Sequence, residues 1–184
     1  MQISTMLRPL LLGLTLAGGP ALAQTTPAPT PPPFEAKASD VATPEAIVTA
    51  LYDVISGPVG QARDWDRFRS LFADGARLVP AGARPDGTSG YRVMTPEDYI
   101  TRGAKSLVES GFTEREIHRV VESYGPVVHV FSTYEARHNG EKDPFARGIN
   151  SIQLVNDGKR WYVLTIFWSA ETDKQKVPAK YLPK

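Results

Sequence analysis

The chain has 184 residues, a formal net charge of +1 and no cysteine. This length favours a single domain, and a hydrophobic content of 41% is sufficient to build a core. The balanced charge argues against a nucleic-acid partner, which would call for a strongly basic surface. Without cysteine, the chain can form neither a disulfide nor a lipid anchor on a cysteine.

The first residues are typical of a secretory signal peptide. One cation, Arg8, precedes an apolar run from Leu10 to Leu16, and small residues lead up to Ala21-Leu22-Ala23. The apolar run is much shorter than the roughly 20 residues of a membrane-spanning helix. We therefore expect cleavage after Ala23, a periplasmic or secreted protein, and contact with the membrane only during export. Removal of residues 1–23 would leave 20 basic and 20 acidic residues.

Residues 24–42 are predicted to be a proline-rich linker without regular structure, because repeated proline fixes φ and removes N–H donors. Three amphipathic helices are predicted next. The first and third begin at Thr-Pro-Glu, with threonine as the N-cap. The predicted helices cover residues 43–56, 64–74 and 95–110, with short strands at 76–80 and 91–94 and a loop at 81–90.

Four longer segments rich in β-branched and aromatic residues follow, at 112–124, 127–137, 147–155 and 160–169. A two-residue turn at Asp157-Gly158 would pair Asn150 with Thr165 and place Phe167 on the same face as Asn150. Helices followed by an antiparallel sheet predict an α+β domain over residues 43–171, in which three N-terminal helices cover one face of the sheet. Residues 172–184 would form a C-terminal tail.

In the order of these elements, the chain resembles the nuclear transport factor 2-like (NTF2-like) superfamily, which includes ketosteroid isomerases and SnoaL-like polyketide cyclases. Three stretches carry the resemblance: Ala50-Leu51-Tyr52, residues 64–76, and residues 149–154 with Phe167-Trp168-Ser169. The resemblance implies a cone-like, curved antiparallel sheet of the cystatin-like kind. It also implies an apolar pocket inside the cone and a homodimer formed through the sheet.

Set beside the ketosteroid isomerases, Tyr52 lies at the position of their oxyanion-binding tyrosine, Asn150 near that of a protonated aspartic acid, and Trp168 at that of a pocket tryptophan. Their general base should follow Ala76 on the first strand, but residues 77–80 contain no carboxylate. Abstraction of a carbon-bound proton needs a base within hydrogen-bond reach. The resemblance therefore implies a similar pocket without ketosteroid isomerase activity.

The candidate ligand-binding residues are Tyr52, Tyr134, Asn150 and Trp168. Their types suit a pocket for a small apolar or amphipathic molecule, which is mostly apolar with a few polar groups. Each could instead be a core residue with its polar atom satisfied by the protein. Our leading hypothesis is an exported domain that binds such a molecule without a cofactor.

Two other functions stay open. One is a cyclase, isomerase or dehydratase that uses a different acid–base pair, such as His129 with Tyr52 or Tyr134. His129 lies in an apolar run, so it could also be a core histidine. The three histidines lack the spacing of metal ligands, and we expect no metal site. The other is a protein-interaction module of the cell envelope.

Overall fold

The computed structural model describes residues 34–84 and 86–184, so the expected signal peptide and residues 24–33 of the expected linker lie outside the described residues. Its elements are α1 (Ala38–Val41), α2 (Pro44–Ile55), α3 (Trp65–Ser70), β1 (Phe72–Ala83), β2 (Ser89–Tyr91), α4 (Pro96–Glu109), β3 (Phe112–Tyr124), β4 (Val127–His138), β5 (Ala146–Asn156), β6 (Trp161–Ala170) and the 3₁₀ turn η1 (Ala179–Tyr181).

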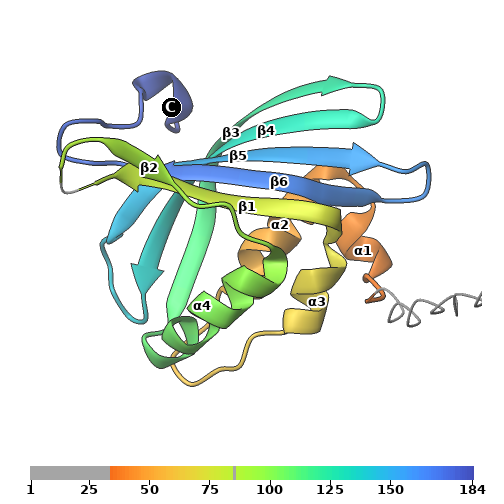
Figure 1. The fold of residues 1–184 in the computed structure, drawn as a ribbon, viewed down its shortest axis with the longest axis horizontal. Helices are drawn as coiled ribbons and strands as arrows, with labels where there is room; N and C mark the ends of the chain where they lie inside the picture. The colour runs from red at the N-terminus through yellow and green to blue at the C-terminus, as the bar shows by residue number, and fades with distance from the viewer. Residues whose placement is uncertain (1–33, 85) are drawn as a thin grey trace, which may run out of the picture. The chain divides into compact units, whose positions relative to one another are not determined.

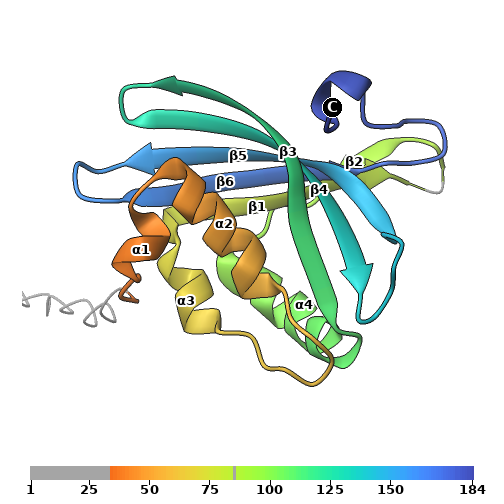
Figure 2. The same ribbon diagram turned by 180° about the vertical axis from the view of Figure 1, so that it is seen from behind.

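The strands form one six-stranded sheet in the order β2-β1-β6-β5-β4-β3. Every pairing is antiparallel except that of β1 with β6, which is parallel. Helices α1 to α4 gather on one face of the curved sheet, and the C-terminal segment lies on the other (Figures 1 and 2). The predicted α+β class and the three predicted helices are confirmed as α2, α3 and α4. The core fills the space between the two layers and includes Ile47, Leu71 and Ile152.

The helix starts follow their capping residues. The side chain of Thr43 accepts a hydrogen bond from the amide of Ala46, and Thr95 and Asp98 form a capping box at the start of α4. Helix α3 is shorter than predicted, because Phe72 already pairs with β6. The Asp74-Gly75 sequence marks an irregularity in β1 and not a helix end: Gly75 has φ of +75°, and the register with β6 shifts between Phe72 and Arg77.

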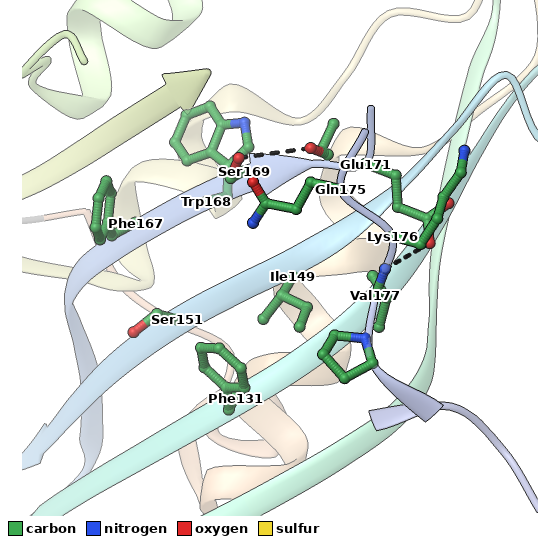
Figure 3. A pocket seen from close by; sticks show the side chains of 12 residues that line it. Phe131, Ile149, Ser151, Phe167, Trp168, Ser169, Glu171, Gln175, Lys176 and Val177 are labelled. Carbon is green, nitrogen blue, oxygen red and sulfur yellow. Dashed lines mark hydrogen bonds between the residues drawn. The ribbon is translucent and has the colours of Figure 1, made fainter. Parts of the chain in front are cut away.

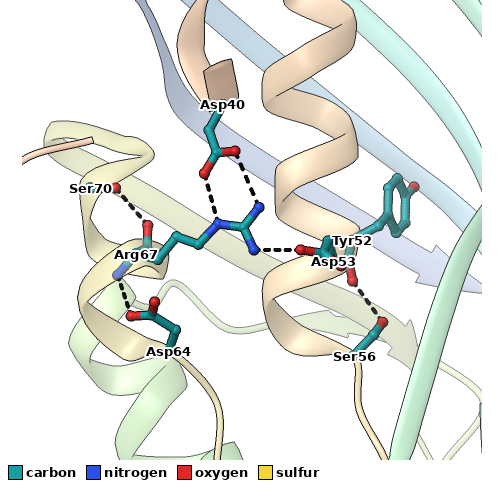
Figure 4. Close-up of polar contacts among 7 residues, drawn as sticks. All are labelled: Asp40, Tyr52, Asp53, Ser56, Asp64, Arg67 and Ser70. Atoms are coloured by element: carbon teal, nitrogen blue, oxygen red, sulfur yellow. Dashed lines mark hydrogen bonds and ion pairs between the residues drawn. The ribbon is translucent and has the colours of Figure 1, made fainter. Parts of the chain in front are cut away.

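Helix α1 lies in a segment that the sequence predicts to be irregular. Its Asp40 is buried and accepts hydrogen bonds from Arg67 of α3, at 2.7 Å from Nε and 3.2 Å from Nη2. Arg67 also pairs with Asp53 of α2, so one guanidinium joins three helices (Figure 4). These carboxylates raise the pKa of Arg67, with the Asp40 hydrogen bond as the largest cause. A paired buried acid such as Asp40 is hard to recognise in a proline-rich stretch.

The predicted register of the last hairpin is wrong. The connection spans Asp157 to Arg160 instead of a two-residue turn, and Asn156 pairs with Trp161. A bulge at Leu164 then shifts the register again, so Asn150 pairs with Trp168 and not with Thr165. Because one extra residue reverses the faces of a strand, Ile166 and Trp168 border the interior, whereas Phe167 is 47% exposed.

The C-terminal tail packs on the outer face of the sheet. Thr133 Oγ1 donates a hydrogen bond to the carbonyl of Tyr181 at 2.7 Å, and the Tyr181 ring meets Phe131 edge-on at 5.0 Å. A hollow of about 230 Å³ remains between the tail and β4, β5 and β6. Figure 3 shows Val177 of the tail and Ile149 of β5 among its lining side chains. The lysines and prolines of this segment predict a frayed end, whereas in the structure Tyr181 holds it against the sheet.

Glu135, on the same outer face, is 7% exposed and contacts three arginines. Arg147 donates to it at 2.8 Å, Arg137 at 2.7 Å and Arg115 at 3.3 Å. These hydrogen bonds, that of Arg147 first, lower the pKa of Glu135 to about 2. The pKa of a glutamate carboxyl is about 4.3 in an unfolded chain. Because the pKa of Glu135 is lower in the folded chain, its charge stabilises the fold at any pH above these two pKa values.

We therefore expect Glu135→Gln to lower the free energy of unfolding by about 2–3 kcal/mol at pH 6. The difference from the unmodified protein should shrink as the pH falls from about 5 towards 2, because the carboxyl then becomes protonated in both states. Urea unfolding at a series of pH values measures both. A difference that stays constant down to pH 2 would show that the charge of Glu135 does not stabilise the fold.

Candidate functional site

A cavity of about 280 Å³ lies between the helices and the inner face of the sheet. This is at the small end of ligand-binding pockets, which commonly measure about 300–1,000 Å³. Its walls are mostly aliphatic and aromatic, with a few polar side chains among them. The lining residues are Leu51, Tyr52, Ile55, Phe68, Leu78, Tyr99, Leu107, Phe112, Glu114, Tyr134, Ala136, Phe145, Ala146, Asn150, Ile152, Ile166 and Trp168.

The structure brings the four candidate ligand-binding residues together around this cavity. Tyr52 comes from α2, Tyr134 from β4, Asn150 from β5 and Trp168 from β6. In β5 buried residues alternate from Gly148 to Leu154, which turns Asn150 inwards, and Tyr134 of β4 pairs with Gly148 on the same face. Trp168 joins them because of the bulge at Leu164, which the alternation of the sequence does not reveal.

A directed chain of hydrogen bonds starts at Asn150. Its Nδ2 donates to the Tyr52 hydroxyl at 3.0 Å, and this hydroxyl lies 2.7 Å from the hydroxyl of Ser132. Ser132 donates in turn to Glu116, which is paired with Arg119. Because the carboxylate of Glu116 can only accept, the proton of Ser132 points to it, and Tyr52 must donate to Ser132. The hydroxyl proton of Tyr52 is therefore already used within the protein.

Glu114 of β3 is a polar lining residue that sequence reasoning missed, as is Tyr99 of α4. Glu114 Oε1 accepts a hydrogen bond from Asn150 Nδ2 at 3.2 Å, and no salt bridge reaches it from the described part of the chain. Burial raises its pKa to about 7, although the Asn150 hydrogen bond acts in the opposite direction. The sequence held one signal: Glu114 is two residues from Phe112, so strand alternation puts both on one face.

Two tyrosine hydroxyls complete the polar part of the cavity. Tyr99 comes from the first turns of α4, and Tyr134 from β4. Burial raises the pKa of both, and the nearby charge of Glu114 adds to the increase. Among residues 34–84 and 86–184, neither hydroxyl has a hydrogen-bond partner. Both can therefore donate to a ligand, and so can a protonated Glu114.

Comparison with known proteins yields structures only: no known protein family and no curated protein matches the chain. A protein of unknown function from Nostoc punctiforme, described as having a cystatin-like fold, superposes with a TM-score of 0.53 and 8% identity, covering 70% of this chain and 89% of that chain. A protein from Kribbella flavida gives a TM-score of 0.50 and 12% identity, covering 68% and 86%. The chain has a cystatin-like fold.

Another match is an NTF2-like protein from Cytophaga hutchinsonii, with a TM-score of 0.46 and 13% identity, covering 68% of this chain and 89% of that chain. The cystatin-like fold expected from the resemblance is confirmed by the match to the Nostoc punctiforme protein. Identities this low show the fold alone, so the function must be argued from the cavity itself.

In this cystatin-like fold, His129 lies on the face of the sheet opposite the cavity. Its neighbours Val128 and Val130 are buried on the inner face, and its own side chain meets Ser151 Oγ at 3.0 Å and the ring of Phe131. The alternative of an acid–base pair with Tyr52 or Tyr134 needs His129 inside the cavity. The geometry does not bring those residues together, and Glu114 is the titratable acid that the cavity contains.

The cavity borders solvent at Phe145, which lines it and is 50% exposed. The Phe145 ring stacks on His138 at 4.1 Å and lies 6.3 Å from Phe112. This aromatic cluster joins the loop before β5 to the ends of β3 and β4. Within the described ranges, no three His, Asp or Glu side chains gather as metal ligands, and no helix is long and apolar enough to cross a membrane.

Proposed function

We propose that the cavity binds a small, mostly apolar molecule that carries one polar group. The observation behind this proposal is the pairing of apolar walls with two tyrosine hydroxyls that lack hydrogen-bond partners among the described residues and with a carboxyl group that only Asn150 hydrogen-bonds there. Buried polar groups are normally hydrogen-bonded. A ligand whose polar end reaches Glu114, Tyr99 and Tyr134 would satisfy them, while its apolar part contacts Phe68, Phe112 and Trp168.

Ketosteroid isomerase activity is not part of this proposal. The residue of β1 that lines the cavity is Leu78, an aliphatic side chain in the region where those enzymes would carry their base. In addition, the hydroxyl proton of Tyr52 is directed to Ser132, so Tyr52 is not free to donate to a developing oxyanion. Both features favour binding over that reaction.

We also propose that the protein is exported and forms a homodimer. The basis for export is the tripartite pattern of residues 1–23. The basis for a dimer is the resemblance to proteins that commonly pair through the sheet, together with exposed apolar side chains of β6, Leu164 at 43% and Phe167 at 47%.

Native mass spectrometry of the full chain, expressed in a bacterium and recovered from its periplasm, tests these proposals together. We expect a chain that begins at Gln24, a dimeric mass, and a reproducible additional mass that disappears on denaturation. A chain that keeps residues 1–23 would contradict export, and a monomer at micromolar concentration would contradict the dimer. A ligand-free mass in every preparation would count against the binding function.

Glu114 supports a second candidate function, that of an enzyme with acid–base chemistry. A carboxyl with a pKa near 7 is suited to accept and return a proton at neutral pH. Such an enzyme would exchange a carbon-bound proton of its ligand with solvent. The captured ligand, incubated with the protein in deuterium oxide, should then gain deuterium, and Glu114→Gln should prevent it. An unchanged ligand mass after prolonged incubation would reject this candidate.

A further inference from the structure

The cavity has an aromatic wall on several sides of its one acidic group. Aromatic side chains line it from three helices, three strands and the loop before β5: Tyr52, Phe68, Tyr99, Phe112, Tyr134, Phe145 and Trp168. Aromatic faces attract cations because their π-electrons give them a negative potential, and rings arranged around a site are used to hold organic ammonium groups. The apolar character of the wall therefore does not exclude a charged ligand.

Glu114 lacks a cation of its own in the structure. The arginines nearest to it along β3 are used elsewhere: Arg115 pairs with Glu135 on the outer face, and Arg119 pairs with Glu116. Only Asn150, a neutral donor, contacts the Glu114 carboxyl group among the described residues. An isolated carboxylate is costly to bury, and a cation brought by the ligand would remove that cost.

We propose that the ligand is a small organic amine, whose ammonium group pairs with Glu114 while its apolar part fills the aromatic cavity. This inference names the class of ligand and rests on the binding function proposed above. The amine would form charge-assisted hydrogen bonds to Glu114, which are stronger than those between neutral groups. The hydroxyl oxygens of Tyr99 and Tyr134 can accept further hydrogen bonds from the ammonium group.

The titratable and charged groups around Glu114 set the pH dependence. They are Tyr52 and Asp53 of α2, Tyr99 of α4, Arg115, Glu116 and Arg119 of β3, and Tyr134 of β4. Burial keeps the pKa of each of these tyrosines above its usual value, so they stay neutral at pH 8. Between pH 5.5 and 8 the charge state of Glu114 itself changes, because burial raises its pKa to about 7.

Three series of compounds test the inference: phenylalkyl amines, alcohols and carboxylates of equal length, each with two, three and four methylene groups. Calorimetric titration at pH 8 should show that the best amine binds about tenfold or more tightly than the alcohol of equal length, and that the carboxylate binds least. At pH 5.5 the preference for the amine should shrink, because protonated Glu114 carries no charge. Near pH 7, amine binding should release protons, which titration in two buffers measures.

Glu114→Gln keeps the size and the hydrogen-bonding capacity of the side chain and removes its charge. We expect this variant to bind the alcohol as before and to lose the preference for the amine. Glu122→Gln is the matched control, because it removes the same charge from an exposed position of β3 outside the cavity lining. It should leave the preference in place.

The outcomes separate the two proposals. If alcohols bind as tightly as amines, or if Glu114→Gln keeps the preference, the amine inference is overturned while the binding function stands. If no compound of any series or length binds, both proposals fail. Tighter binding of the amines than of the alcohols, with the preference lost in Glu114→Gln and kept in the control, supports both.

Discussion

Replacing Arg63 with methionine should lower the free energy of unfolding by about 3–4 kcal/mol, because several partly buried carbonyl groups lose their donor at once. Arg63 is 6% exposed, and its guanidinium donates to the backbone carbonyls of Ile55 at 2.9 Å, Gly57 at 2.7 Å and Leu107 at 3.0 Å, and also to that of Gln61. Methionine keeps the apolar length of the side chain and offers no donor.

The guanidinium of Arg63 joins three parts of the chain at one point. Its partners lie at the end of α2, in the following loop and near the end of α4. Since Ile55 and Leu107 both line the cavity, the expected loss includes ligand binding. The partners of Arg63 among the described residues are backbone carbonyls, so its role is to donate hydrogen bonds and not to pair with an acid. Desolvation lowers its pKa.

Urea unfolding followed by tryptophan fluorescence measures the effect, with Arg92→Met as the control. Arg92 is exposed, and its substitution should change the unfolding free energy by less than about 0.5 kcal/mol. Arg63→Lys separates charge from geometry. It keeps the charge, but a single ammonium group cannot reach carbonyls on several sides, so it should lose most of the same stability. Equal stability of Arg63→Met and Arg92→Met would contradict this account.

The helices and long strands could be predicted because their signals are local. Capping residues mark the starts of α2 and α4, and β-branched residues mark β3 to β6. The errors fall where tertiary pairing overrides a local signal. Asp74-Gly75 is a helix-ending pair by sequence, yet it lies inside β1 because Phe72 pairs with Val163. The bulge at Leu164 has no local signal, and it exchanges the faces of every later residue in β6.

The cavity residues also divide into those that the sequence could predict and those that it could not. Tyr52, Asn150 and Trp168 could be predicted through the resemblance, which transfers positions without physical derivation. Glu114 and Tyr99 could not, because their place in the cavity depends on how β3 pairs with β4 and how α4 packs against β1. A glutamate among charged neighbours on an edge strand is ordinarily exposed. Here the start of β3 is bonded to the end of α2, where Ser56 Oγ hydrogen-bonds the backbone of Glu114, and this glutamate lines the cavity.

Gly148 of β5 lies directly beside the backbone of β6 and the cavity residue Tyr134. It is a buried residue of β5, and its φ is not positive, so its backbone would suit any residue. The constraint is space: a Cβ there would overlap the carbonyl oxygen of Ser169 on β6 and lie 2.7 Å from the Tyr134 hydroxyl oxygen. The Tyr134 ring can move, but the backbone of a paired strand cannot move without loss of hydrogen bonds.

We expect Gly148→Ala to lower the unfolding free energy by about 2–3 kcal/mol, in the upper part of the usual range of about 1–3 kcal/mol for inserting one carbon into a packed site. It should also weaken ligand binding, because it displaces the Tyr134 hydroxyl from its place in the cavity. Gly82→Ala is the matched strand control: Gly82 also lacks a positive φ, and a Cβ added there would meet no other atom within 4 Å. That substitution should leave both unchanged or slightly raise stability, since alanine restricts the unfolded chain.

The two glycine variants together show whether packing fixes Tyr134 in the cavity. If Gly148→Ala and Gly82→Ala unfold at the same urea concentration, the end of β6 must be free to move, and Tyr134 is then not fixed by packing. If Gly148→Ala is destabilised but binds ligand normally, Tyr134 does not contact the ligand, and the polar end of the site is limited to Glu114 and Tyr99.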